Sequence, residues 1–285
     1  MRLAIQGAGR TLAVGLAMSL GVSLGVAATA TEARAWEFRV CADADSLPFS
    51  NSAGEGYDNA IAELLADELG AELSYVWLPN TRGAIRQQYV QAGHCDVLMG
   101  VLEGQRGFLT SHAYYRTGYV FLYPEGADFE LGSLDDAVLK ELRIGVPGGA
   151  RKLIPPSVAL VKRGVVDNLI HFDDRRTNGE RYIPAVQAVA EGSVDAAIVW
   201  GPFAGQYAGE VGGVVVTPVR PEIDLPFIPM VASLTIGFRP GDEALRDDVN
   251  AALAGSWDAI EAVLEAHGVP QLALPRPVST LGSGG

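Results

Sequence analysis

Short apolar runs alternate with segments whose apolar residues have helical spacing, beginning just after residue 36. The segment YDNAIAELLADELG shows the helical type, because Ile61, Leu65 and Leu69 fall on one face before Gly70 ends the helix. CDVLMGV shows the other type, a run with the composition of a buried strand. The predicted elements of this part are strands at 37–42, 71–77 and 95–104 and helices at 57–70 and 82–93.

The same order of elements starts again after residue 126, with helices at 133–142, 155–164 and 183–192 and strands at 142–149, 168–172 and 194–200. A strand at 231–241 and an amphipathic helical stretch at 242–268 complete the pattern. Strands that alternate with helices of this length predict an α/β fold with parallel sheets and helices on both faces.

Two extended segments, 117–126 and 214–222, flank the second set of elements. This arrangement predicts a bilobed molecule in which one lobe is inserted into the other and two hinge strands join them. We expect residues 36–122 with 221–270 to form lobe 1 and residues 123–220 to form lobe 2, with the carboxyl ends of the strands facing a cleft. The Pro, Ser and Gly content of residues 271–285 predicts a disordered tail.

The N-terminus has the pattern of a secretory signal peptide. Arg2 and Arg10 precede an apolar stretch that runs to Ala28, and the small-residue sequence ARA ends at Ala35. The next residue is Trp36 rather than a lipid-accepting Cys. We therefore expect cleavage of residues 1–35 and a periplasmic protein without a stable membrane anchor, although the apolar stretch is also long enough to leave an uncleaved anchor open.

Acidic residues outnumber basic ones, 34 to 21, for a net charge of −13. Removal of residues 1–35 takes away three arginines and one glutamate, so the mature charge is near −15. This balance argues against a nucleic-acid partner. Because the charges are interspersed, they fit a solvated surface, and attraction of a basic protein partner is the second interpretation.

Cys41 and Cys95 are the two cysteines of the chain. An oxidising compartment favours a disulfide between them. Against it, Cys41 lies late in its predicted strand and Cys95 opens another, which separates the two Cα atoms if the strands are parallel. The alternative is a pair of buried thiols that pack as small apolar side chains.

The sequence lacks the residue spacings of the common catalytic and metal-binding motifs. The four histidines stand singly, no HxxxH or HExxH pair occurs, and the nucleophile elbow and the nucleotide-binding P-loop are absent from the sequence. Asp43 and Asp45 could begin a calcium loop, but Pro48 and Gly54 occupy the positions that need Gly and Glu. We expect no metal, no cofactor and no enzymatic activity.

Two further motifs allow two interpretations each. GVPGGARK places Gly148 and Gly149 before a helix, which fits a plain strand-to-helix turn or an anion cradle. The aromatic stretch that contains Tyr115 and Arg116 fits a core strand or a stacking surface with a fixed cation.

The chain resembles the type II periplasmic solute-binding proteins of ABC transporters, and in particular the MxaJ/XoxJ branch associated with quinoprotein methanol dehydrogenases. The resemblance covers residues 36–270 and rests on CADADSLPFSN, CDVLMGV, YYRTGYVFLYP and VDAAIVWGPFAG. It implies the bilobed fold and a role beside a pyrroloquinoline-quinone (PQQ) methanol dehydrogenase, calcium- or lanthanide-dependent.

The chain departs from the amino-acid-binding members at two positions. Their Arg in a Thr-containing loop, which grips the ligand carboxylate, is matched here by MGVLEGQRGF, where the Thr is missing and Arg106 is displaced. Their Asp for the ammonium group is replaced by Trp200, Gly201 and Pro202, in what we expect to be an exposed turn after a strand. Without these grips, the desolvation of a zwitterion is not offset.

We therefore predict an apolar cleft that binds a protein partner or a partly apolar solute. The predicted cleft residues are Asp43, Pro48, Phe49, Gly100, Glu103, Tyr115, Arg116, Gly148, Gly149, Trp200, Gly201, Pro202 and Phe203. The leading hypothesis is an accessory protein that binds a methanol dehydrogenase during its maturation or activation. The alternative is a receptor that delivers a small, partly apolar solute to an ABC permease.

Overall fold

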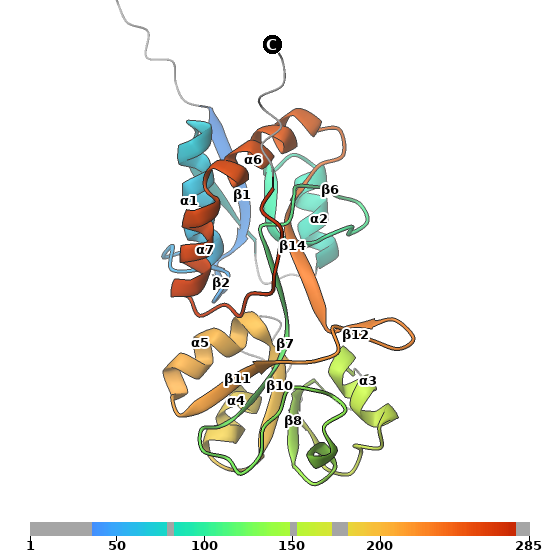
Figure 1. Cartoon of the computed structure of the whole chain (residues 1–285). Coiled ribbons are helices and arrows are strands. Elements are labelled where there is room, and N and C mark those ends of the chain that lie inside the picture. Colours follow the sequence, from blue (N-terminus) through green and yellow to red (C-terminus); the bar gives the residue numbers. More distant parts are fainter. Residues whose placement is uncertain (1–35, 79–82, 149–152, 173–181, 278–285) are drawn as a thin grey trace, which may run out of the picture. The chain divides into compact units, whose positions relative to one another are not determined.

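The computed structural model describes residues 36–78, 83–148, 153–172 and 182–277 (Figure 1). Residues 35–285 form one unit by their internal contacts. The predicted signal peptide at 1–35 and its cleavage site lie outside the described residues. Within the described ranges, no helix has both the length and the apolar character needed to cross a membrane.

Lobe 1 is built on a sheet whose strand order is β4, β1, β5, β14. These strands are β1 (Glu37–Asp43), β4 (Glu72–Leu78), β5 (Val97–Leu102) and β14 (Val231–Phe238), and the short β6 (Leu109–Thr110) pairs with β14. β1 runs parallel to β4 and β5, whereas β14 is antiparallel to β5. The expected strand–helix–strand order of this part is therefore present. β14, which follows lobe 2 in the sequence, brings the chain back to the lobe 1 sheet.

Helices cover both faces of the lobe 1 sheet (Figure 1). They are α1 (Tyr57–Leu69), α6 (Glu243–Gly255) and α7 (Trp257–Ala266) on one face and α2 (Gly83–Gln91) on the other. Side chains of successive strand residues point to opposite faces, so Val40 packs with α1 while Cys41 packs with Val90 of α2. This alternation gives lobe 1 two apolar layers.

Lobe 2 repeats the arrangement on a smaller scale (Figure 1). Its strands are β8 (Ile144–Pro147), β9 (Leu169–Phe172), β10 (Ala196–Trp200) and β11 (Val214–Pro218), and its helices are α3 (Pro155–Lys162), α4 (Ile183–Ala190) and α5 (Gly201–Val211). β8 is parallel to β9 and β10. Ala159 and Leu160 of α3 belong to one core cluster, and α4 and α5 supply a second one.

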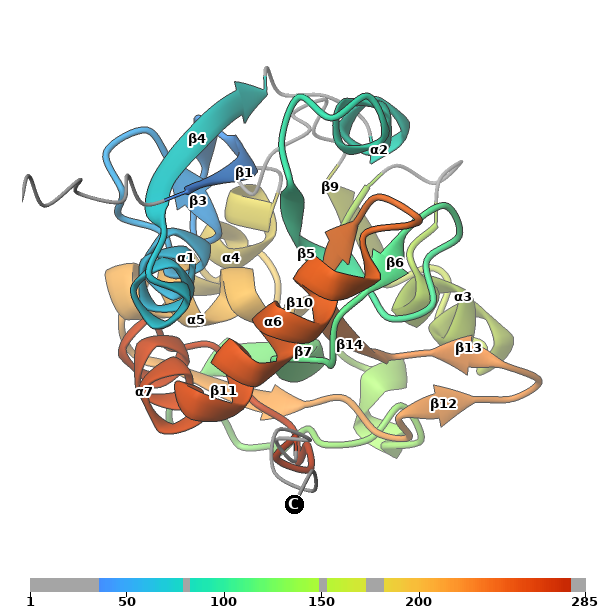
Figure 2. The same cartoon turned by 90° about the horizontal axis from the view of Figure 1, so that it is seen from above.

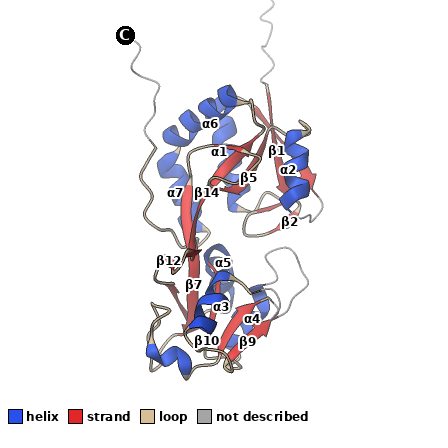
Figure 3. Cartoon of the chain, turned by 90° about the vertical axis from the view of Figure 1, so that its right-hand side faces the viewer, coloured by secondary structure: helices blue, strands red, loops and turns tan. Residues whose placement is uncertain are grey.

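One long strand, β7 (Tyr115–Pro124), belongs to both lobes (Figure 3). Its first residues pair with β14 in lobe 1, and its last residues pair with β10 and β11 in lobe 2. Because β7 crosses without a break, the boundary predicted between residues 122 and 123 stays a prediction. The second crossing runs from β11 to β14 and contains a small hairpin of β12 (Ile223–Asp224) and β13 (Ile228–Pro229).

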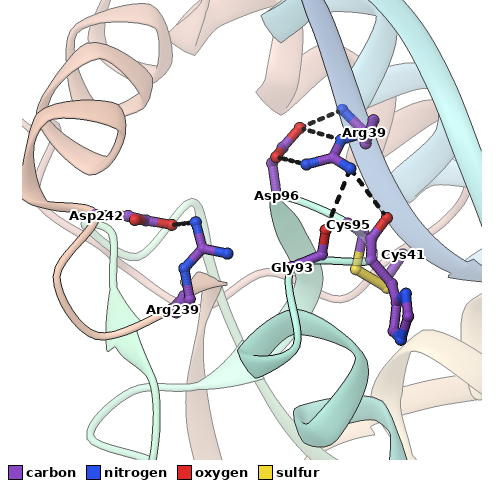
Figure 4. A network of polar contacts seen from close by, with 8 residues as sticks. Arg39, Cys41, Gly93, Cys95, Asp96, Arg239 and Asp242 are labelled. Atoms are coloured by element: carbon purple, nitrogen blue, oxygen red, sulfur yellow. Dashed lines mark hydrogen bonds and ion pairs between the residues drawn. A yellow bond between two sulfur atoms is a disulfide. The ribbon is translucent and has the colours of Figure 1, made fainter.

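Cys41 and Cys95 form a disulfide with 5.5 Å between their Cα atoms. The objection from parallel strands fails because Cys95 precedes the first residue of β5, in the connection from α2, and can therefore approach β1. The next residue, Asp96, reinforces this connection, because its carboxylate accepts hydrogen bonds from the Arg39 guanidinium at 2.6 and 3.2 Å (Figure 4). The connection is thus tied to β1 by one covalent and one ionic link.

Two helix predictions were wrong in their extent. The helix expected at 133–142 is a single 3₁₀ turn, Ala137–Lys140, because the Asp136 side chain accepts bonds from Gly132 and Ser133 and holds a turn instead of capping a helix. The stretch 242–268 is divided at Ser256 into α6 and α7.

The prediction of an exposed turn at 200–202 was also wrong. Gly201 and Pro202 are buried and open helix α5, since Pro at the first turn of a helix sacrifices no intrahelical hydrogen bond.

The C-terminal segment contacts the rest of the protein over a longer stretch than its composition predicts. Leu272 N–H donates to the Arg116 carbonyl at 2.7 Å and Arg276 pairs with Asp258, while residues 278–285 lie outside the described residues.

Candidate functional site

The chain segment that follows β1 folds back on itself and forms the short hairpin of β2 (Asp45–Ser46) and β3 (Ser50–Asn51). The Ser50 hydroxyl donates to the Asp43 carbonyl at 2.8 Å, and its oxygen accepts from the Asp43 N–H at 3.2 Å. Asp58 N–H donates to the Phe49 carbonyl at 2.8 Å and Tyr57 N–H to the Pro48 carbonyl at 2.9 Å. These bonds fix the loop against the start of α1.

A cavity of about 110 Å³ lies in lobe 1 between this loop, α1 and α2. This volume exceeds what a single water molecule needs and suits several waters or a small molecule. The chemistry of its wall comes from Asp43, Phe49, Asp58, Asn59, Arg86 and Gly100. Three of the predicted cleft residues, Asp43, Phe49 and Gly100, therefore line one cavity.

Asp43 already has a cationic partner in this cavity. Arg86 Nη2 lies 2.6 Å from Asp43 Oδ2, and Asp43 is only 3% exposed. Arg86 Nε is also buried and has no hydrogen-bond partner among the described residues. Arg86 is thus already paired with Asp43, the acid at the end of β1. Its Nε remains available to donate a hydrogen bond to a bound molecule.

Asp58 is the second buried acid of the wall. The Tyr114 hydroxyl donates to Asp58 Oδ1 at 2.7 Å. Burial raises the pKa of Asp58 to about 7, and the Tyr114 hydrogen bond and the charge of Arg86 lower the pKa only in part. Gly100, whose φ is +69°, passes close by, since a Cβ built on it would lie 3.5 Å from Asp58 Oδ2. Asp58 can therefore present a neutral or a charged carboxyl near neutral pH.

Asn59 is fully buried and supplies a further unused donor. Its Oδ1 accepts hydrogen bonds from the backbone N–H of Asn51 at 3.0 Å and Gly56 at 3.2 Å, which fixes the orientation of the amide. Its Nδ2 has no hydrogen-bond partner among the described residues. Because a buried polar group without a partner is unfavourable, this atom points to a bound water or ligand with an acceptor.

Five rings gather where the two lobes meet, and we call them the aromatic seam: Phe49, Tyr119, Tyr182, Trp200 and Phe203. Of these, Phe49 also lines the cavity. Phe49 of lobe 1 meets Phe203 of lobe 2 edge to face, with 5.2 Å between ring centroids. Phe203 stacks on Tyr182 at 4.3 Å, and Trp200 lies edge-on to Tyr119 at 5.1 Å. The half-buried Trp200 packs against core clusters of both lobes. The seam is thus an apolar contact between the lobes.

Gly201 allows the seam to close. A Cβ at this position would lie 2.7 Å from the Gly118 carbonyl oxygen and 2.8 Å from Thr117 Oγ1, which is closer than packed atoms tolerate. Gly201 and Pro202 therefore serve the approach of α5 to β7 and present no group to a ligand.

Two predicted cleft residues lie elsewhere. Tyr115 is buried in the core of lobe 1, where its hydroxyl bonds that of Tyr57 at 2.7 Å. Arg116 pairs with Glu222 in the second crossing, and this ion pair holds the pKa of Glu222 below its usual range. The reason is that β7 pairs with β14 at this point, so Tyr115 points into the apolar core of lobe 1. Neither residue lines the cavity.

The Gly-rich motif and the loop after β5 also stay apart from the cavity. Gly148, with φ at +96°, donates its N–H to the Phe172 carbonyl at 2.9 Å, which is the geometry of a turn beside β9. Gly149, together with Arg151 and Lys152, lies outside the described residues. Glu103 and Arg106 are exposed.

Sequence reasoning missed Asp58, Asn59 and Arg86. A signal for Asp58 and Asn59 was present. These polar residues lie in the first turn of an apolar helix, but the residue that caps this helix is Gly56. Arg86 gave no signal, because a single Arg on a short helix is ordinarily a solvated residue. Among the described residues, no group of three or more His, Cys, Asp or Glu side chains is arranged to hold a metal ion.

Known proteins share this architecture. The chain is 31% identical over 248 residues to protein MoxJ of Paracoccus denitrificans, covering 82% of this chain and 88% of MoxJ. The crystal structure of MxaJ from Methlophaga aminisulfidivorans MPT is 28% identical with a TM-score of 0.72, covering 82% of this chain and all of MxaJ. The structure of the periplasmic binding protein XoxJ from Methylobacterium extorquens AM1 is 31% identical with a TM-score of 0.66, covering 83% of this chain and all of XoxJ.

These similarities confirm the bilobed type II periplasmic binding protein fold and the predicted resemblance to the MxaJ/XoxJ branch. The model of the bacterial extracellular solute-binding proteins, family 3, matches residues 38–259, most of the described chain. The chain therefore belongs to family 3 of the bacterial extracellular solute-binding proteins.

Proposed function

We propose that this protein is a periplasmic accessory protein that binds a PQQ-dependent methanol dehydrogenase and assists its maturation or activation. The relatives MoxJ, MxaJ and XoxJ support the link to methanol oxidation. Within the molecule, the observation that carries the proposal is the ion pair between Arg86 and Asp43. Because Asp43 is bound to Arg86, its carboxylate is not free to hold a positively charged nutrient.

The energetics of the pair disfavour a free amino acid as ligand. An ammonium group in the cavity would have to displace Arg86 from Asp43, and the half-buried guanidinium, which is 29% exposed, would then lose its charged partner. Loss of a hydrogen bond between charged groups costs about 1.5–3 kcal/mol. Phe49, Tyr119 and Trp200 of the aromatic seam are only partly buried and offer apolar surface, which suits a side chain or segment of a protein partner.

A second function, the delivery of a small solute to an ABC permease, is favoured by the unused groups of the cavity. Asn59 Nδ2 and Arg86 Nε need acceptors, and the Asp58 carboxyl can donate when neutral or accept when charged. With two carboxylates against one guanidinium, the wall disfavours anions. The fitting solute is therefore a small neutral molecule with a hydroxyl or amide group and an apolar remainder.

The test compares the two functions on the processed protein. We would measure binding to the methanol dehydrogenase of the source organism by calorimetry, with wild type and with Phe49→Ser, which removes the lobe 1 side of the aromatic seam. Accessory function predicts a dissociation constant in the micromolar range or below and at least tenfold weaker binding by the variant.

The same protein would be screened by thermal shift against the common amino acids and against small alcohols and amides. Absence of binding to the dehydrogenase together with a micromolar alcohol or amide ligand would establish the receptor function instead. A micromolar amino-acid ligand would refute the argument from Arg86 and Asp43.

A further inference from the structure

The hairpin of β12 and β13 presents its apolar side chains to solvent. Ile223, Leu225 and Phe227 are 59, 79 and 87% exposed. The hairpin projects from the second crossing, away from the sheets of both lobes (Figures 1 and 2). Single exposed apolar side chains are common on proteins, but three within five residues on one projecting element form a patch that needs an explanation.

The base of this hairpin is held firmly on lobe 2. Asp224 is buried, and its carboxylate lies 2.7 Å from Arg163 Nη2 and 3.6 Å from Lys162 Nζ. Lys162 also donates to the Leu225 carbonyl. On the other strand, Ile228 packs against the lobe 2 core. An element braced in this way does not fold its apolar tip back onto the protein.

A fixed apolar tip is the form of an interface anchor. Anchors of this kind fill a pocket on the partner and lose little conformational entropy, because the free protein already holds them in place. We propose that the hairpin tip of Leu225 and Phe227 is a docking element that inserts into an apolar pocket on a protein partner. The proposal rests on the proposed function only in taking the methanol dehydrogenase as that partner.

The exposed area argues against a second copy of this chain as the occupant. The three side chains offer roughly 400 Å² together, about half of the ~800 Å² that each partner contributes to an ordinary stable interface. Two such tips could not hold a symmetric dimer, and each copy carries a net charge of −13. The tip fits a partner that supplies the remaining contact area itself.

The charge also argues against a membrane surface as the occupant, since a strongly acidic protein is repelled by anionic lipids. Around the tip, the charges are paired with one another. Arg163 binds Asp135 and Asp224, and Glu222 binds Arg116 and Arg220. The pocket on the partner therefore needs no charged rim, and insertion of the tip should be nearly insensitive to salt.

The test is the binding of the double variant Leu225→Ser, Phe227→Ser to purified methanol dehydrogenase, by calorimetry at about 20 mM and 150 mM salt. We expect at least tenfold weaker binding than wild type, by the same factor at both salt concentrations. The matched control is Val211→Ser, which alters an exposed apolar side chain at the end of α5 and should bind as wild type. Thermal melts would verify that all three proteins are folded.

The outcomes separate this proposal from the proposed function. Wild-type binding that the double variant retains in full would overturn the docking role and leave the accessory function intact. Failure of wild type to bind the dehydrogenase would overturn both. Two further comparisons of wild type with the double variant address the other occupants. Binding to vesicles of phosphatidylcholine and phosphatidylglycerol, or dimerisation in sedimentation, that wild type shows and the double variant loses would each overturn the proposal.

Discussion

Replacement of Asp58 by Asn isolates the effect of one buried acid on stability. The side chains have the same shape, and the Asn carbonyl can still accept the hydrogen bond from the Tyr114 hydroxyl, which is 2.7 Å long in the structure. The substitution therefore removes the ionisable group and leaves its main contact in place. Asp58 is 6% exposed, so solvent screens its charge little when it ionises.

The size and sign of the effect follow from the pKa of Asp58, which burial raises from 3.8 to about 7. Between these values the folded protein holds a proton that the unfolded chain has released, so the stability of wild type falls as the pH rises. The fall begins near pH 4 and levels off above pH 7. Three pH units at about 1.4 kcal/mol each give a total of about 4 kcal/mol.

The assay is urea unfolding of wild type and Asp58→Asn at pH 5 and pH 8, with Asp67→Asn, on the exposed side of the same helix, as the control. We expect the variant to gain about 3 kcal/mol relative to wild type between the two pH values, because part of the penalty is already present at pH 5. The control should show no such gain. An equal difference between variant and wild type at both pH values would refute the assignment of a raised pKa to Asp58.

Three other substitutions have defined outcomes. Joint replacement of Cys41 and Cys95 by Ser should lower stability by about 4 kcal/mol, because the bridge closes a loop of 54 residues, and guanidinium unfolding without reductant that matches wild type would contradict this. Trp200→Ala should lower stability by about 2–3 kcal/mol, since the ring is half-buried between two core clusters, and an unchanged melting temperature would place it outside the packing. Asp224→Asn should destabilise at pH 7 by on the order of 1–3 kcal/mol. Arg163 lowers the pKa of Asp224, so this loss should shrink as the pH falls below 4, and thermal melts at pH 7 and 3.5 measure it.

The order of strands and helices could be predicted from the sequence because each element has its own apolar periodicity. Residues 57–69 illustrate this, since their buried side chains recur at helical spacing in the structure as in the sequence. The 3₁₀ turn at Ala137–Lys140 could not be predicted in the same way. There, capping residues and an apolar pattern favoured a helix, and the competing bonds of Asp136 to Gly132 and Ser133 form only in the folded loop.

The sequence predicted only those residues of the candidate site whose location follows from their place in the order of strands and helices. Asp43 is the last residue of a parallel strand and Phe49 follows it, and this end of a strand faces the ligand side in α/β proteins. The pairing of Asp43 with Arg86 joins residues 43 positions apart and depends on how α2 packs over the sheet. Likewise, the burial of Tyr115 depends on which strands flank β7, and the alternation of aromatic residues does not contain that information.

The start of α1 explains how stability and ligand chemistry are linked in this protein. Successive helical residues point about 100° apart. Tyr57 therefore reaches the core hydroxyl of Tyr115, while Asp58 and Asn59 reach the cavity. A molecule bound there acts on Asp58 directly: a ligand that donates to the charged carboxylate is favoured above pH 7, and one that accepts from the neutral acid is favoured below it. Because binding to the folded state raises stability by mass action, thermal shifts of one ligand at pH 5 and pH 8 distinguish these two polarities without a structure of the complex.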